Sequence, residues 1–206
     1  MRELNAADLD EIVRVHGAAF PESILTLFGP EAVKRYYAWQ LSGPHDIAFL
    51  GLFMDGRLAA FCLGGIFQGA MKGFVRKNRA WLAAKLFSSP SLWTQRRFWR
   101  KAAAIRGMFR FCPRGAKAAP APVPCDSFGI SAIAVDPARR REGLGRKLMD
   151  ASQEIALARG FLKMDLSVNP SNRGAISFYE SLGWKKTGDG TDWNGCMIKN
   201  LEKEIA

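Results

Sequence analysis

Along the first third of the chain, the alternation of hydrophobic and polar residues predicts a strand, two helices and a β-hairpin. The first helix follows Asn5, a good helix cap, and the second begins at Pro30, where the missing N–H costs nothing. Asp55-Gly56 joins two apolar runs, which is a strong signal for a tight hairpin turn. In chain order these elements cover residues 1–4, 6–19, 30–41 and 47–67.

The last third of the chain again predicts alternating strands and helices. The expected order is strand, helix, strand, helix and a closing pair of strands, over residues 130–135, 144–159, 162–168, 172–182, 185–187 and 194–198. In the second of these strands, apolar and polar residues alternate, so one of its faces is expected to be buried. The apolar positions are Leu162, Met164, Leu166 and Val168.

The middle of the chain carries all of the excess positive charge. Residues 56–125 contain 14 Lys and Arg and no Asp or Glu, whereas the remainder has 16 basic and 19 acidic residues. The composition predicts helices at 72–87 and 93–111 and a proline-rich linker at 112–125. We therefore interpret 68–126 as a basic helical insertion with a linker, inside a single domain of 1–206. Such a charge imbalance indicates an anionic partner.

Several classes of protein are disfavoured by composition. The four cysteines are scattered without a C-x-x-C pair, which argues against both a zinc site and a disulfide framework. No apolar run approaches the roughly 20 residues that span a bilayer, and the N-terminus lacks the apolar core of a signal peptide. We expect no metal and a cytoplasmic location, with contact at the inner face of a membrane as an alternative.

The loop between the strand at 130–135 and the helix that follows it has the composition of an anion-binding turn. It contains Arg140-x-x-Gly143-x-Gly145-Arg146 at the start of the helix. Free N–H groups at a helix N-terminus bind phosphate when glycines leave the approach open. No Gly-Lys-Ser/Thr is present, and Leu148 occupies the third glycine position of a dinucleotide fingerprint. A pyrophosphate is therefore the expected ligand.

Two motifs in register resemble those of the GNAT superfamily of N-acetyltransferases. The first is Val135-Asp136-Pro137 followed by the arginine- and glycine-containing turn, and the second is Asn172-x-x-Ala175-x-x-Phe178-Tyr179-x-x-Leu182-Gly183-Trp184. The resemblance is specific over 127–184, looser over 1–67 and absent over 68–126. Arg141 departs from the family pattern, since many relatives carry glycine there. The implied fold is α/β: a mixed, mostly antiparallel sheet with splayed central parallel strands, flanked by helices.

The resemblance also implies a site for the acyl donor, acetyl-CoA. In the family, coenzyme A lies in a cleft where two neighbouring parallel strands splay apart. The backbone of the first strand would face the pantetheine, the turn would surround the pyrophosphate, and the second motif would contact the thiol end. The implied residues are Ile133, Ala134, Val135, Arg140, Arg141, Gly143, Leu144, Gly145, Arg146, Asn172, Ala175, Phe178 and Tyr179.

The same resemblance makes Tyr179 the general acid that protonates the departing thiolate. Without it, Tyr179 would be interpreted as a core aromatic on an amphipathic helix. The general base is less defined: Glu22 is the leading candidate, Asp126 is another, and ordered water is a third. His16 lies on an apolar stripe, so we expect it to be packed in the core.

The expected reaction is acetyl transfer from acetyl-CoA to a primary amine. An amino sugar on a phosphate-bearing carrier, linked to a nucleotide or a lipid, would explain the basic insertion; a protein N-terminus or lysine is the alternative acceptor. A non-catalytic module that binds a membrane or an anionic polymer is the rival function. Residues 69–111 mix basic and aromatic side chains, which suits a peripheral membrane contact. The remaining partner predictions are no nucleic acid and a homodimer.

Overall fold

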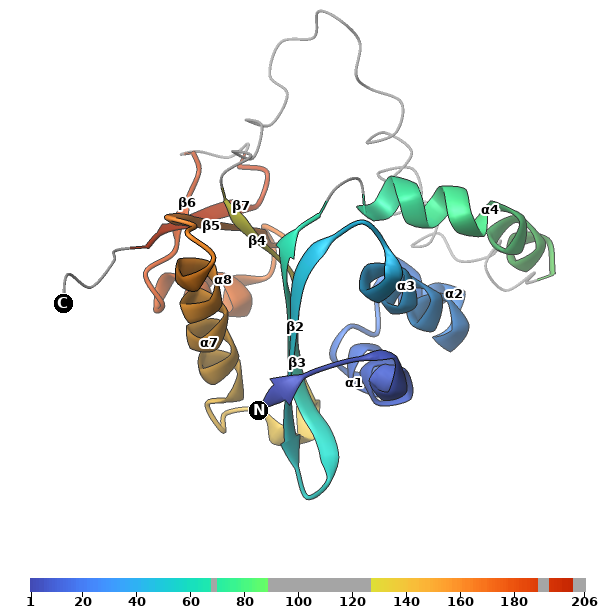
Figure 1. The fold of residues 1–206 in the computed structure, drawn as a ribbon, viewed down its shortest axis with the longest axis horizontal. Coiled ribbons are helices and arrows are strands. Elements are labelled where there is room, and N and C mark those ends of the chain that lie inside the picture. The colour runs from blue at the N-terminus through green and yellow to red at the C-terminus, as the bar shows by residue number, and fades with distance from the viewer. Residues whose placement is uncertain (68–69, 89–126, 189–192, 202–206) are drawn as a thin grey trace, which may run out of the picture.

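The computed structural model describes residues 1–67, 70–88, 127–188 and 193–201. It contains a seven-stranded sheet of order β1-β2-β3-β4-β5-β7-β6 (Figure 1). Every neighbouring pair is antiparallel except β4 and β5, which confirms the expected mixed α/β fold. The strands are β1 Arg2–Glu3, β2 Asp46–Met54, β3 Arg57–Ile66, β4 Phe128–Val135, β5 Lys163–Ser167, β6 Lys185–Lys186 and β7 Cys196–Asn200.

Helices cover both faces of this sheet (Figure 1). The helices α1, α2 and α3 lie on one face, and α7 and α8 lie on the other. Each layer buries its own apolar cluster against the sheet. The helical elements are η1 Ala6–Asp8, α1 Leu9–Ala19, α2 Ile24–Phe28, α3 Pro30–Ser42, α4 Ala70–Ser88, η2 Pro137–Arg139, α7 Leu144–Ala158 and α8 Arg173–Glu180.

Local sequence signals explain several of the element boundaries. The Asn5 side chain accepts a hydrogen bond from the N–H of Ala7 at 2.9 Å, and the Asp8 carboxylate accepts one from the N–H of Asn5 at 3.0 Å. In the hairpin turn, Asp55 and Gly56 have φ of 51° and 75°, the left-handed pair that matches the twist of the strands. These features confirm the predicted first helix and hairpin.

Helix α4 extends the first helical layer beyond α3 (Figure 1). Phe74 is buried and meets the ring of Tyr36 edge-on at 5.5 Å between centroids. The helix predicted at 72–87 is thereby confirmed. The helix predicted at 93–111 and the linker at 112–125 lie outside the described residues.

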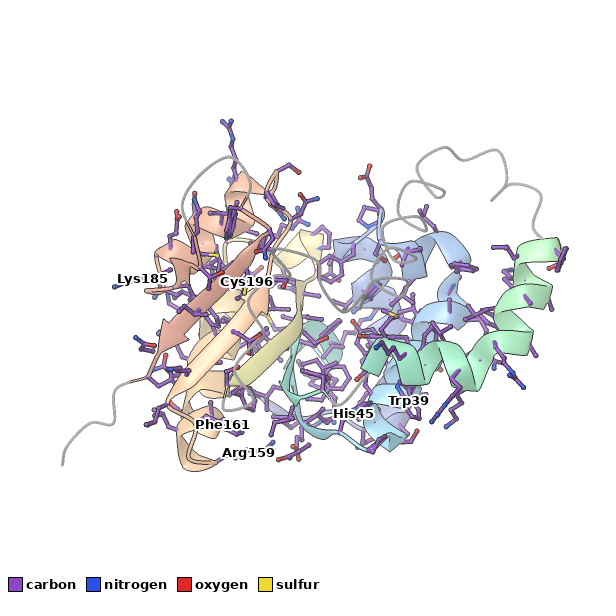
Figure 2. All side chains as sticks on the ribbon, turned by 90° about the horizontal axis from the view of Figure 1, so that it is seen from above. Trp39, His45, Arg159, Phe161, Lys185 and Cys196 are labelled. Carbon is purple, nitrogen blue, oxygen red and sulfur yellow. The ribbon has the colours of Figure 1, made fainter. Side chains whose placement is uncertain are left out.

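Arg159 and Phe161, which follow the C-terminal end of α7, contact the beginnings of β2 and β4 (Figure 2). Arg159 donates to the Asp46 carboxylate at 2.9 Å and to the Ile47 carbonyl at 3.2 Å. Phe161 packs edge-on against Phe128 at 5.8 Å between centroids. These contacts hold the C-terminal end of α7 beside β2 and β4.

Two sequence expectations need correction. The short helix α2 was not predicted, although Ser23 caps it by accepting a hydrogen bond from the N–H of Thr26 at 3.0 Å. Strand β5 begins at Lys163, so Leu162 precedes it and is 54% exposed instead of lying on the buried face. Met164, Leu166 and Val168 are buried, as the alternation predicts.

Within the described part of the chain, no helix combines the length and the hydropathy that a membrane span requires. Cys62 is buried and Cys196 is partly buried, and both thiols are free. The described residues contain no group of three or more His, Cys, Asp or Glu side chains that could hold a metal ion.

Candidate active site

The parallel strands β4 and β5 separate after three residue pairs. Phe128, Gly129 and Ile130 of β4 pair with β5, and the pairing stops at Ile130 and Leu166. At the same point β4 has an irregular register with β3: Gly64 pairs with Ile130 and Leu63 with Ala132, which leaves Ser131 as an extra residue. A bulge of this kind turns a strand away from its neighbour. The sheet therefore opens beside residues 131–135, which include Ile133, Ala134 and Val135, whose backbone is expected to face pantetheine.

The loop after β4 ends in a helix start whose backbone donors are free. Gly143 is the N-cap of α7 with φ of 74°, a left-handed conformation that favours glycine. The N–H of Lys147 is the first that bonds back into the helix, to the Gly143 carbonyl at 3.1 Å. The preceding N–H groups of residues 144–146 have no partner within the helix, so they can receive an anion. Arg141 also adopts a left-handed φ of 70°, a conformation that favours glycine.

Three arginines lie around the N-terminus of α7, and their charges are not paired with any described carboxylate. Arg140, Arg141 and Arg146 are exposed, and none forms an ion pair with another described residue. Arg139, by contrast, pairs with Asp55 in the hairpin turn and lies 3.9 Å from Glu142. Leu144 is only 6% exposed, because its side chain belongs to the core; it can therefore offer an incoming phosphate its N–H alone.

Helices α7 and α8 touch where the two sequence motifs meet. A Cβ added at Gly145 would lie 3.2 Å from Cζ of Phe178, so glycine permits this close approach. Phe178 precedes Tyr179, whose ring centroid lies 5.3 Å from that of Phe178. The anion-binding turn and the phenol are thus positioned by one direct contact between their helices.

Tyr179 is buried at 9% exposure, and its ring also packs beside Trp184. Burial raises the pKa of the Tyr179 phenol to about 12, with a smaller contribution from Cys62. The phenol is therefore protonated near neutral pH and can donate a hydrogen bond. Asn172, the other polar residue of this motif, is the exposed N-cap of α8 and accepts a hydrogen bond from the N–H of Ala175 at 3.1 Å.

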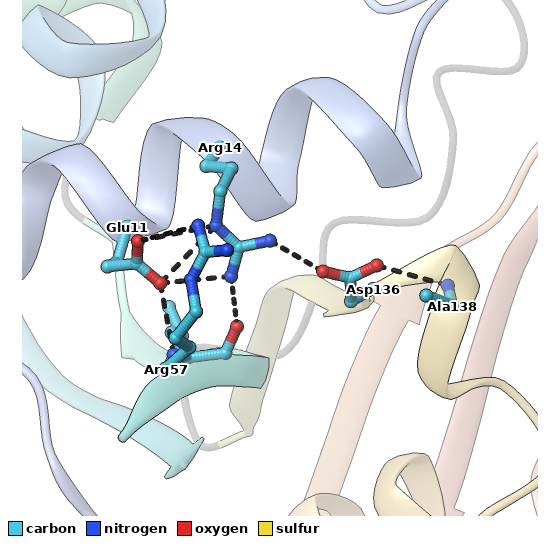
Figure 3. A network of polar contacts seen from close by, with 6 residues as sticks. Glu11, Arg14, Arg57, Asp136 and Ala138 are labelled. Carbon is cyan, nitrogen blue, oxygen red and sulfur yellow. Dashed lines mark hydrogen bonds and ion pairs between the residues drawn. The ribbon is translucent and has the colours of Figure 1, made fainter. Parts of the chain in front are cut away.

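A charged network connects α1, β3 and Asp136, the first residue of the loop after β4 (Figure 3). The Arg14 guanidinium donates to the Asp136 carboxylate at 2.6 Å, to the Leu58 carbonyl at 2.5 Å and to Glu11 at 2.9 Å. Asp136 also accepts from the N–H of Ala138 at 3.0 Å. The hydrogen bond from Arg14 lowers the pKa of Asp136, so this carboxylate is ionised over the physiological range. Sequence reasoning missed this network because its members lie far apart in the chain.

Replacing Arg14 by methionine should lower the free energy of unfolding by about 2 kcal/mol. The variant keeps the aliphatic stem but removes charge-assisted hydrogen bonds to three partners, each of which contributes on the order of 1 kcal/mol. Chemical denaturation measures the change. Lys34→Met is the control, because Lys34 forms a single exposed ion pair with Asp10 and its loss should change the stability much less. Equal losses in both variants would contradict a supporting role for the network.

His16 is packed in the core of the α1–α3 layer, as predicted. It is 5% exposed, its Nδ1 lies 2.9 Å from the Tyr37 hydroxyl, and its Nε2 lies 3.0 Å from the Ser23 hydroxyl. Burial lowers the pKa of His16 from its ordinary 6.5 to about 4. Glu22 is exposed in the loop between α1 and α2 and stays a prediction as base; Asp126 lies outside the described residues.

Stability should therefore decrease as the pH falls from about 6.5 towards 4. In this window the unfolded chain binds a proton at His16 and the folded chain does not, so each pH unit costs about 1.4 kcal/mol. Between pH 7 and pH 4.5 we expect His16 to contribute a loss of roughly 2–3 kcal/mol. Denaturant unfolding of the wild type and of His16→Gln at both pH values isolates this contribution. His45 is present in both proteins and cancels; an equal pH-dependent loss in the two would contradict the prediction.

Comparison with known proteins agrees with this geometry. Residues 104–184 match the model of the acetyltransferase (GNAT) family. The match begins inside the segment interpreted above as an insertion. The chain is 41% identical over 61 residues to the ribosomal protein bS18-alanine N-acetyltransferase of Escherichia coli K12. That alignment covers 30% of this chain and 41% of the relative, so it spans less than half of the relative's length.

Solved structures resemble the chain over almost its whole length. PaiA N-acetyltransferase from Thermoplasma acidophilum, in complex with coenzyme A, has a TM-score of 0.57 at 15% identity, and the match covers 97% of each chain. The ribosomal-protein-S18-alanine N-acetyltransferase from Escherichia coli has a TM-score of 0.54 at 20% identity, covering 100% of this chain and 96% of that one. The fold is thus that of the acetyltransferases. The match to the acetyltransferase (GNAT) family model covers residues 104–184 of this chain.

Proposed function

We propose that this protein transfers an acetyl group from acetyl-CoA to a primary amine. The observation that carries the proposal is the placement of a helix N-terminus and three arginines at one end of the gap between β4 and β5, with a buried phenol beside them. These arginines form no ion pair with a described residue. The first group of features suits a pyrophosphate, and the second suits a leaving thiolate.

The chemistry assigns a task to each part of this site. Acetyl-CoA supplies a thioester carbonyl; the amine nitrogen forms the new C–N bond, and the C–S bond breaks. A backbone N–H within residues 131–135 that points away from β3 would stabilise the oxyanion. Tyr179 would donate a hydrogen bond to the departing sulfur. The pKa of a thiol is about 8.5, which is lower than the pKa of Tyr179. Transfer of the phenol proton to the thiolate is therefore unfavourable unless Tyr179 receives another proton at the same time.

For the acceptor, we propose an amino sugar on a phosphate-bearing carrier. Helix α4 contains no acidic residue, and Lys72, Arg76 and Arg79 are exposed on one of its sides. These positions are spaced by four and three residues, so they form a continuous basic stripe. The opposite side packs Phe74 and Trp81 toward α3, where the Arg35 guanidinium lies 4.8 Å from the Trp81 ring centroid. This stripe would bind the phosphates of a large acceptor.

A protein N-terminus is the alternative acceptor. The E. coli relative is named for acetylating the alanine of ribosomal protein bS18, which motivates the alternative. A third possibility is that the basic stripe binds an anionic membrane and the protein does not catalyse acetyl transfer.

Thiol release from acetyl-CoA in the presence of an amine panel tests these alternatives. The panel contains glucosamine, glucosamine 1-phosphate, a nucleotide-linked amino sugar, glycinamide and a peptide with an N-terminal alanine. We expect the phosphate-bearing sugars to have the highest kcat/KM, and Arg76→Ala/Arg79→Ala to lower their kcat/KM roughly tenfold while sparing glucosamine. Peptide preference would select the alternative acceptor. No turnover with any amine, together with binding to anionic vesicles, would select the non-catalytic function.

A further inference from the structure

Asp165 of β5 lies on the face of the sheet opposite to Tyr179. Its neighbours Met164 and Leu166 are buried in the cluster formed with α7 and α8, the cluster that also contains Tyr179. Because successive side chains of a strand point to opposite faces, Asp165 points toward the α1–α3 side. In the sheet it lies between Gly129 of β4 and Ile198 of β7.

The Asp165 carboxylate is partly buried and has a hydroxyl partner. The Ser127 hydroxyl donates to its Oδ1 at 2.6 Å. A Cβ added at Gly129 would lie 3.6 Å from the same oxygen, 3.7 Å from the Phe67 ring and 3.3 Å from the Gly65 carbonyl oxygen, so these groups gather on one side of Gly129. Burial raises the pKa of Asp165, and none of the described lysines or arginines forms an ion pair with it. A partly buried carboxylate without a cationic partner is suited to a cation from outside the fold.

This carboxylate lies close to the point in the sheet where β4 and β5 diverge. Asp165 pairs with Gly129, one residue before the last pair, Ile130 and Leu166. Burial raises the pKa of Tyr36, a buried residue of α3, and Ser131, the extra residue of the bulge, partly offsets this rise. Polar groups on the α3 side thus lie beside the opening, and Tyr179 lies on the other side. A thioester in this gap would have a phenol on one face of the sheet and a carboxylate on the other.

We propose that Asp165 binds the ammonium group of the acceptor and takes the first of its protons. This inference rests on the proposed acetyl transfer and identifies the acceptor as a cationic primary amine that enters from the α1–α3 side. The acceptor nitrogen loses two protons in all. One passes to Asp165 before attack and then to solvent, and the other ends on the sulfur that leaves. Ser127 is a positioning residue, because its hydroxyl holds the Asp165 carboxylate.

The substitution Asp165→Asn tests the proposal, with Asp150→Asn as the matched control. Asp150 is an exposed carboxylate on α7, on the opposite side of the sheet. For Asp165→Asn we expect kcat/KM for the best amine of the panel to fall about 100-fold or more, with the KM for acetyl-CoA changed less than about twofold. The melting temperature should stay the same or rise, because the substitution removes a buried charge. Ser127→Ala should fall between the wild type and Asp165→Asn in activity, and Asp150→Asn should match the wild type.

Two results would overturn the assignment. One is kcat/KM of Asp165→Asn within about threefold of the wild type. The other is a fall in melting temperature of more than about 4 °C together with the loss of activity. That result would indicate a purely structural role for the carboxylate, through its hydrogen bond to Ser127.

A binding measurement separates this inference from the proposed function. Glycinamide is titrated into the coenzyme A complex near neutral pH and followed by NMR. We expect Asp165→Asn to weaken its binding about tenfold or more, whether or not the wild type shows turnover. Equal affinity of the two proteins, or no binding by the wild type, contradicts the ammonium site. If glycinamide binding depends on Asp165 but the wild type shows no turnover, the proposed acetyl transfer is overturned and the ammonium site is kept.

Discussion

Replacing Tyr179 by phenylalanine is expected to lower kcat by about 100-fold or more and to leave the Kd of coenzyme A nearly unchanged. The substitution removes one hydroxyl from a buried side chain, and the phenol is protonated because burial raises its pKa to about 12. Its hydrogen bond to the sulfur becomes strong only as negative charge develops there, so the loss affects the transition state more than binding. Steady-state kinetics and calorimetric titration with coenzyme A measure the two quantities.

Tyr37→Phe is the matched control for this prediction. Tyr37 is fully buried and its hydroxyl lies 2.9 Å from His16 Nδ1, so the variant should lose roughly 1 kcal/mol of stability without a comparable loss of kcat. If Tyr179→Phe retained the wild-type kcat, Tyr179 would be a core aromatic with no role as the acid. If both variants lost the same activity, the effect would be one of packing.

Removing Arg140 and Arg146 together should raise the Kd of coenzyme A roughly 100-fold. Both side chains are exposed at the start of α7 and form no ion pair with a described residue, so their charge is available to a pyrophosphate. A charge-assisted hydrogen bond to phosphate contributes about 1.5 kcal/mol or more, and two of them account for the expected change. The double alanine variant should also show a weaker salt dependence of binding, because two cations are absent.

The control for this pair is Arg76→Ala/Arg79→Ala on α4. It removes the same two charges from the same chain, but from the surface proposed to meet the acceptor. Binding of coenzyme A should be unaffected in this variant. Equal weakening by both double variants would indicate a general effect of net charge, and no weakening by Arg140→Ala/Arg146→Ala would remove the turn from the donor site.

Part of this fold could be read from local sequence. The Asp55-Gly56 turn, the Asn5 cap and the α7 start at Gly143 depend on residues close together in the chain, and all three lie where predicted. The short helix α2 could not be predicted with the same ease. Five apolar and hydroxyl residues, Ile24–Phe28, show no helical periodicity, and their helix forms because Ser23 caps it and α3 packs against it.

The site was predictable to a smaller extent. The motifs indicated which residues belong to the turn. They did not indicate which of these residues contribute a side chain and which contribute only a backbone N–H. Leu144 shows the difference: its position beside the pyrophosphate follows from the motif, whereas the burial of its side chain follows from the packing of α7 on the sheet. Arg14 carries no local signal, because its partner Asp136 is 122 residues away.

The sequence by itself therefore determined the turns, the caps and the helix N-terminus that suits an anion, since these depend on the backbone preferences of neighbouring residues. Only the tertiary structure decided where β4 leaves β5, which face of the sheet Asp165 occupies and how strongly burial raises the pKa of Tyr179. Each of these depends on contacts between segments far apart in the chain, and the strand register and the exclusion of water that produce them exist only in the folded protein.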